Sequence, residues 1–280
     1  MPSTTSTGWS ARLDAVFARR SERTVPLRRS HEGPLRWQRM LYPEGAPVCH
    51  AIVVHPPGGV AGGDELDIAV AAERDAHALL TTPGAAKWYR STGATARQSI
   101  RLAARSGAAI EWLPQETIVF DGAAATWTLD AEVDHSAAIV GCDVVMLGRA
   151  ARGEKFARGA LHVCTQLRRG GALAFVEQWR LVGGDRRLDA PQGLGGEPCF
   201  GTLWALADPQ RLEPALAPVR AALATGAERA AATLLPAGAL IVRALGPGPE
   251  AVRRALEAAW AALRPPVLGV AARRPRIWST

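Results

Sequence analysis

The 280-residue chain contains few cysteines, and none of them has the spacing of a metal-binding or disulfide motif. The four are Cys49, Cys142, Cys164 and Cys199. The absence of any CxxC pair argues against both a zinc knuckle and a disulfide framework. Because the neighbouring residues are apolar, we expect most of these cysteines to be buried thiols.

The sequence also lacks a long apolar run and an apolar leader. No stretch approaches the roughly 18 uncharged apolar residues of a membrane-spanning helix. The N-terminal stretch MPSTTSTGWSARLDAVFARR has no apolar centre of the kind found in signal peptides. These absences predict a cytoplasmic protein with no membrane partner.

The motifs of several common enzyme classes are missing. The stretch GGVAGG at 58–63 is not followed by the Lys-Ser/Thr with which a P-loop binds phosphate and magnesium. There is no G-x-S-x-G elbow and no HExxH zinc motif. Cys49 and His50 are adjacent, so on a strand they point to opposite faces and cannot readily share an ion. The sequence therefore predicts no catalytic residues and no tightly bound cofactor.

The chain has an excess of positive charge, with a formal net charge of +7 and a pI of about 10.0. Its arginine pairs are scattered along the sequence and are not interleaved with the aromatic residues of a base-stacking platform. This distribution argues against a nucleic-acid partner and favours an acidic protein partner.

Short β-rich runs broken by Gly, Pro, Asp and Ser follow one another between residues 36 and 181, as in a sandwich, a barrel or a β-coil. Two alternating runs, Leu161–Leu167 and Ala172–Leu181, flank a glycine-containing turn and predict a hairpin. The other predicted strands are Ala51–Val54, Leu66–Ala71, His77–Thr81, Thr95–Leu102, Ala109–Trp112, Thr126–Val133, Ala138–Leu147 and Ala239–Leu245.

Helical periodicity occurs only late in the chain. A helix is predicted near 249–263, where Pro265 and Pro266 end it. A second is predicted near 209–226, although Pro214 and Pro218 should break it or delay its start. Strands first and helices last predict a mainly β single domain over 31–280 with two helices in its C-terminal half. Residues 1–30 are predicted to be an N-terminal extension, partly disordered.

Three carboxylates stand out as candidate functional residues. Asp143 and Glu177 each interrupt an apolar strand, where a charge must be paired, hydrated or used. Asp64 closes the glycine-rich loop HPPGGVAGGD, which starts at His55. For each of the three, a purely structural role remains the alternative at this point.

A different class of function is also open from the residues alone. Glu111, Glu116 and Asp121 lie close together in sequence, and paired carboxylates serve glycoside chemistry. Trp112 and Trp127 could stack on a sugar, although core packing explains them equally well. The alternative prediction is a β-rich hydrolase or carbohydrate-binding domain.

Five segments taken in order resemble one protein family. They are HPPGGVAGGD (55–64), TTPGAAKWYR (81–90), EWLPQETIVFDGA (111–123), GEKFARG (153–159) and the terminal RPRIW (274–278). Together they resemble the urease accessory protein UreD family, called UreH in some organisms. In that terminal segment we expect Ile277 and Trp278 to dock on the β-body.

The resemblance implies a scaffold and not an enzyme. Members of this family bind apo-urease and act with UreF and, through UreF, with the GTPase UreG, to insert nickel into urease. The family fold is mostly β, coiled in a helical manner, with two helices. The resemblance also implies transient Ni²⁺ passing through an internal channel, for which Asp64, Asp143 and Glu177 are the candidate metal-contacting residues.

Overall fold

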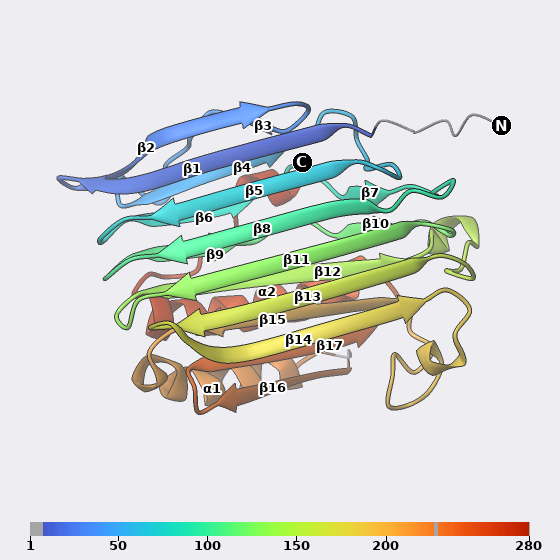
Figure 1. The fold of residues 1–280 in the computed structure, drawn as a ribbon. Coiled ribbons are helices and arrows are strands. Elements are labelled where there is room, and N and C mark those ends of the chain that lie inside the picture. The colour runs from blue at the N-terminus through green and yellow to red at the C-terminus, as the bar shows by residue number, and fades with distance from the viewer. Residues whose placement is uncertain (1–7, 227–228, 280) are drawn as a thin grey trace.

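The computed structural model describes residues 8–226 and 229–279, and its strands form two stacked sheets (Figure 1). The front sheet contains, in spatial order, β14 (Ala172–Val182), β13 (Ala160–Arg169), β11 (Ala124–Val133), β8 (Ala96–Ala104), β5 (Glu65–Ala72), β1 (Ser10–Arg20) and β2 (Arg23–Glu32). The back sheet contains β16 (Arg229–Leu235), β17 (Ala239–Gly246), β15 (Cys199–Leu206), β12 (Ala138–Leu147), β9 (Ala109–Trp112), β6 (His77–Thr81), β4 (Val48–Val54) and β3 (Arg36–Trp37). The short strands β7 (Ala86–Trp88) and β10 (Thr117–Val119) join it through β12.

The chain coils between the two sheets. From β5 to β13 its long strands lie alternately in the front and the back sheet, and neighbours within each sheet are parallel. Parallel neighbours cannot be joined by a tight hairpin, and here each connection passes through the opposite sheet. The result is a β-solenoid of about 4 turns, which confirms the predicted mainly β, coiled architecture.

Several predicted strands have the predicted bounds. β6, β9 and β12 begin and end at the expected residues, and the predicted hairpin is the antiparallel pair β13 and β14. After this hairpin the pairing changes, because β15 and β17 are added to the back sheet in antiparallel order. The solenoid therefore ends at an edge formed by β14 in front and β16 behind.

The predicted N-terminal extension over 1–30 is wrong for the part that the structure describes. β1 lies inside the front sheet between β2 and β5, and it buries Leu13 and Phe17 in the core. Its other inward residues are alanines, and three arginines interrupt or end the pattern, so the alternation is weak in sequence. Residues 1–7 lie outside the described residues.

Two helices cover the outer face of the back sheet: α1 (Pro209–Ala224) and α2 (Pro249–Leu268) (Figure 1). Both predicted proline effects are wrong. Pro214 and Pro218 lie inside a continuous α1, because the helix keeps its buried face of Leu212, Ala215, Val219 and Leu223 against the sheet. α2 continues through Pro265 and Pro266, since Val267 and Leu268 are buried and Gly269 ends the helix in a left-handed conformation.

No helix in the described part of the chain is both long and apolar enough to cross a membrane.

A buried ionic network fastens α2 to the back sheet. The Arg264 guanidinium is fully buried and lies 2.9 Å from Glu111 and 2.6 Å from Glu44. Glu111 also accepts a hydrogen bond from Trp260 Nε1 at 2.7 Å and lies 2.8 Å from His77 Nε2. Burial alone would raise the pKa of Glu111, but hydrogen bonds and charges from His77 and Arg264 outweigh it and lower that pKa to about 2.

The ionised form of Glu111 therefore stabilises the fold above the unfolded-chain pKa of about 4.3, and this contribution is lost as the pH falls toward 2. We expect Glu111→Gln to lower the free energy of unfolding at neutral pH by about 3–5 kcal/mol, because Arg264 would lose a buried partner. Urea denaturation should show the difference from the parent protein shrinking at acid pH. Glu116→Gln is the control, since that carboxylate is part-exposed and 3.5 Å from Arg253. Equal losses in both variants would contradict the role given to the network.

The C-terminal segment packs against this same layer. Trp278 Nε1 donates a hydrogen bond to Thr81 Oγ1 at 2.7 Å, and its ring lies 5.8 Å from the ring of Trp260. The expected docking of Trp278 is thereby confirmed. The segment joins the end of α2 to β6, two elements far apart in sequence.

We expect Trp278→Ala to lower the free energy of unfolding by about 2–3 kcal/mol, because it removes a packed ring and leaves Thr81 without this donor. Arg276→Ala in the same segment is the control, since Arg276 is exposed. Chemical denaturation of both variants measures the difference, and an unchanged midpoint for Trp278→Ala would show that the docking contributes no stability.

Candidate functional site

Two adjoining cavities lie between the sheets. The inter-sheet cavity, about 50 Å³, is lined by residues of the front-sheet strands β8, β11, β13 and β14 and of the back-sheet strands β12 and β15. The mouth cavity, about 210 Å³, lies beside it under the loop at His55–Val60 and the segment Thr82–Lys87. Gln98 and Asp143 line both cavities. These two side chains therefore form the wall that the cavities share.

Asp143 extends from β12 toward the front sheet. Its neighbours in the same inward phase, Ile139, Val145 and Leu147, belong to the core between the sheets. Among the described residues, none forms a hydrogen bond or an ion pair with its carboxylate. Burial, and then the negative charge of Glu177, raise the pKa of Asp143 to about 6. The predicted candidate is therefore a cavity-lining carboxylate without a fixed partner.

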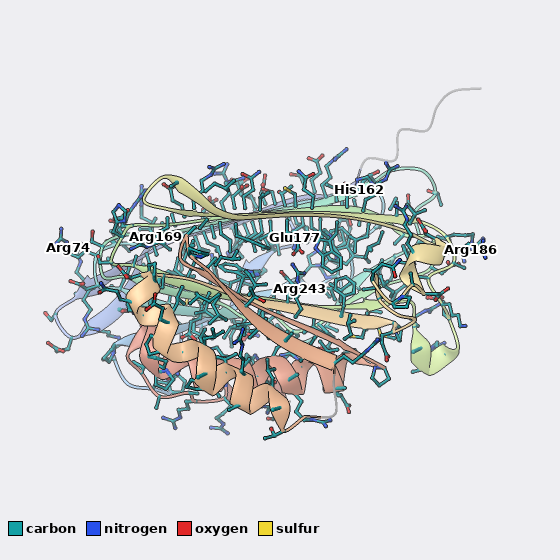
Figure 2. The ribbon with its side chains drawn as sticks, turned by 90° about the horizontal axis from the view of Figure 1, so that it is seen from below. Arg74, His162, Arg169, Glu177, Arg186 and Arg243 are labelled. Atoms are coloured by element: carbon teal, nitrogen blue, oxygen red, sulfur yellow. The ribbon has the colours of Figure 1, made fainter. Side chains whose placement is uncertain are left out.

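Glu177 reaches the inter-sheet cavity from the opposite sheet. It lies on β14 in the inward phase, next to Thr165 of β13. Its Oε1 accepts a hydrogen bond from Arg243 Nη2 of β17, and Figure 2 shows this pair between the two layers. The structure thus brings Asp143 and Glu177 to one cavity, although 34 positions separate them in sequence.

Further polar residues share this region, and the sequence interpretation missed them. Gln98 on β8, Thr165 on β13 and Thr202 on β15 line the inter-sheet cavity, and Arg243 on β17 pairs with Glu177 at its wall. Each lies where the alternation of its strand otherwise places an apolar residue in the core. Asp143, Thr202 and Arg243 form one cross-strand row on the back sheet. The sequence signal that could have identified these residues is a polar residue at an inward-facing position of an otherwise alternating strand.

Three tryptophans add polar atoms to the cavity walls. The indole N–H groups of Trp112, Trp127 and Trp204 are buried without a hydrogen-bond partner in the described part of the chain. Trp112 lines the mouth cavity, and the other two line the inter-sheet cavity. Buried donors of this kind are ordinarily paired with water. Together with the carboxylates, these donors give the cavity walls polar positions that suit water.

The glycine-rich loop shapes the mouth cavity. His55, Gly58, Gly59 and Val60 line it. A Cβ on Gly59 would lie 2.4 Å from the Tyr89 ring, so the close approach of this loop to Tyr89 requires glycine. Burial lowers the pKa of His55, against the charge of Asp64, so its imidazole is neutral at pH 7. Its buried Nε2 has no partner among the described residues, and the sequence interpretation did not select it.

Asp64 has a different position from the other two candidates. Its Oδ1 accepts the backbone N–H of Trp9 and its Oδ2 that of Ala61, both at 2.8 Å. The side chain thereby ties the end of the loop to the start of β1. Among the described residues that line the two cavities, Asp64 does not occur. The geometry indicates a brace for the loop.

The three carboxylates of the alternative prediction do not form a joint site. Glu111 is held in the network under α2. Asp121 accepts hydrogen bonds from the Arg158 side chain and from the backbone N–H groups of Ala157 and Arg158. Glu116 lies 3.5 Å from Arg253, so each of the three has partners of its own. In the described ranges, no three His, Cys, Asp or Glu residues gather in a way that could hold a metal ion.

Comparison with known proteins gives one consistent result. A family model described as UreD urease accessory protein matches residues 10–279. The urease accessory protein UreD of Azoarcus sp. (strain BH72) is 46% identical over 273 residues, which cover 98% of this chain and 95% of that protein. That of Cupriavidus pinatubonensis (strain JMP 134 / LMG 1197) is 47% identical over 277 residues, with 97% and 95% covered. That of Pseudomonas fluorescens (strain Pf0-1) is 45% identical over 274 residues, with 97% and 95% covered. This similarity overturns the alternative of a hydrolase or carbohydrate-binding domain.

The raised pKa of Asp143 predicts a stability that depends on pH. A carboxyl whose folded pKa lies above its unfolded value near 3.9 contributes stability below that value, and loses it as the pH rises through about 6. We therefore expect Asp143→Asn to raise the free energy of unfolding at pH 8 by about 1–2 kcal/mol, with the gain vanishing in acid. Denaturation across this pH range measures it. Asp130→Asn, on the exposed face of β11, should show no such trend, and a matching trend there would contradict the assignment.

Proposed function

This chain belongs to the UreD family of urease accessory proteins, and we propose that it passes nickel through its two adjoining cavities toward urease. UreD proteins are non-catalytic and take part in assembling the nickel centre of urease. The observation that carries the proposal is the Asp143 carboxylate, which has no fixed partner among the described residues and forms part of the wall shared by both cavities.

The chemistry of the lining suits a cation that must move on. Carboxylate, amide and hydroxyl oxygens come from Asp143, Glu177, Gln98, Thr165 and Thr202. Such oxygen ligands hold a divalent transition-metal ion less firmly than thiolates do, and so permit exchange. The neutral imidazole of His55 offers a nitrogen ligand at the mouth. In this proposal Asp64 acts indirectly, by bracing the loop that shapes the mouth.

The same proposal includes a scaffold function. We infer that the protein binds apo-urease and UreF, and reaches UreG through UreF. The net charge of +7 supports association with an acidic partner surface, and such binding should weaken with salt, because exposed charges are screened over about 8 Å at physiological ionic strength. GTP hydrolysis is assigned to UreG, in keeping with the missing P-loop motif in this sequence.

Replacing the cavity carboxylates tests the nickel route. We expect Asp143→Asn and Glu177→Gln each to leave the complex with urease and UreF intact but to lower the nickel content and the activity of urease matured in its presence. The amides keep the shape of the side chains and remove the charges that attract a divalent cation. Co-expression with the urease operon, followed by metal analysis and activity assays on the same preparations, measures all three quantities.

Asp130→Asn is the matched control, since it makes the same change on the exposed face of the front sheet. Asp64→Asn should act through the loop, with lower stability as its first effect, because two backbone N–H groups lose a charged acceptor. Normal nickel content and activity with both cavity variants would refute the proposed route. Loss of the complex in Asp143→Asn would instead assign that residue a structural role.

A further inference from the structure

We propose that Arg243 is a tethered cation that competes with the metal ion for Glu177 and so sets how tightly this end of the passage holds its cargo. The inference rests on the proposed function, because it concerns the same route. Arg243 was not among the residues selected from the sequence. It would be a positioning and specificity residue and would not be a metal ligand.

The competition follows from the geometry of one carboxylate. Glu177 Oε1 accepts the hydrogen bond from Arg243 Nη2, so the guanidinium occupies a position that a bound cation would need. Arg243 belongs to the same cross-strand row as Asp143 and Thr202, and it faces Glu177 across the gap between the sheets (Figure 2). Its Cζ also lies 5.4 Å from the ring centre of Trp179, which lines the same cavity.

Arg243 has room to leave this position, whereas Glu177 does not. The Arg243 side chain is 42% exposed and the Glu177 side chain 16%. The pair lies at the edge where the solenoid ends, between β14 of the front sheet and β17 of the back sheet. A flexible arginine at such an edge can turn outward to solvent at little cost in desolvation. Rotation of the Arg243 side chain alone would therefore free the Glu177 carboxylate for a metal ion.

The charge balance explains why a transport route would contain such a residue. Asp143 and Glu177 together provide two negative charges when both are ionised, which is enough to neutralise a divalent ion. With Arg243 nearby the three side chains carry a net charge of −1, so the bound state with the metal would carry an excess of positive charge. The positive charge of Arg243 repels the divalent ion, which weakens its binding and favours its release. Without it, we expect the two carboxylates to retain the ion.

A second arginine, on the strand next to β14, provides a comparison. Arg169 of β13 lies 2.8 Å from Asp208, the residue that caps α1, and this pair also links the front sheet to the back layer. Figure 2 shows Arg169 away from the Glu177 pair. The partner of Arg243, Glu177, lines the inter-sheet cavity, whereas Asp208, the partner of Arg169, does not occur among the described residues that line either cavity. If the Arg243 pair only fastened the sheets together, substitution of either arginine would have the same effect on Ni²⁺ affinity.

The test uses Ni²⁺ alone, titrated calorimetrically into the purified full-length chain at neutral pH. We expect Arg243→Gln to bind Ni²⁺ about tenfold more tightly than the parent protein, or measurably where the parent shows no binding. Arg169→Gln should bind like the parent. The double variant Arg243→Gln with Glu177→Gln should lose the gain, because the competition is for that carboxylate. Arg243→Lys keeps the charge with a shorter reach and should fall between parent and Arg243→Gln; it also serves as the test if Arg243→Gln does not fold.

The outcomes separate this inference from the route itself. Equal Ni²⁺ affinity in Arg243→Gln and in the parent overturns the competition. A gain that persists in the double variant, or one matched by Arg169→Gln, overturns it as well. Failure of the route has a different readout, namely normal urease nickel content with Asp143→Asn and Glu177→Gln, measured in cells.

Discussion

The structure depends on the burial of the back sheet on both of its faces. One face packs against the front sheet and the other against α1 and α2, so both phases of strands such as β12 and β15 belong to apolar cores. This constraint explains the almost continuous apolar sequence AIVGCDVVML of β12. It also explains Gly141, where a Cβ would lie 2.2 Å from the Trp204 ring. Any charge on these strands must find a partner or a cavity inside the protein.

The chain meets that requirement in two opposite ways. Under α2, Arg264 and Glu111 are completely buried but have several hydrogen-bond partners, so the charges stabilise a link between elements far apart in sequence. Between the sheets, Asp143 has no such partner among the described residues, and burial and the charge of Glu177 raise its pKa. The first arrangement contributes stability, and the second lowers it at neutral pH. Destabilisation that the surrounding fold tolerates is typical of positions kept for function.

The end of the solenoid brings part of the protein interior close to solvent. A coil of parallel strands can continue indefinitely, and here the hairpin of β13 and β14 and the antiparallel addition of β15 and β17 stop it. The last strands of the two sheets leave an edge at which the interior is close to solvent. Polar residues that would be intolerable deeper in the core, such as Glu177 and Arg243, can therefore lie there and face one another.

The sequence alone determined the mainly β class, the bounds of strands such as β6, β9 and β12, and two of the cavity residues, because alternation and a charge in an apolar run are local properties. It did not determine the fate of Pro214 or Pro265, since burial against the sheet outweighs a local helix-breaking tendency. Nor could it distinguish Asp143, which has no fixed partner among the described residues, from Glu111, which is held by Arg264, because both are carboxylates in apolar strands. Only the tertiary structure decided this, by placing Arg264 of a distant helix beside Glu111 and a cavity beside Asp143.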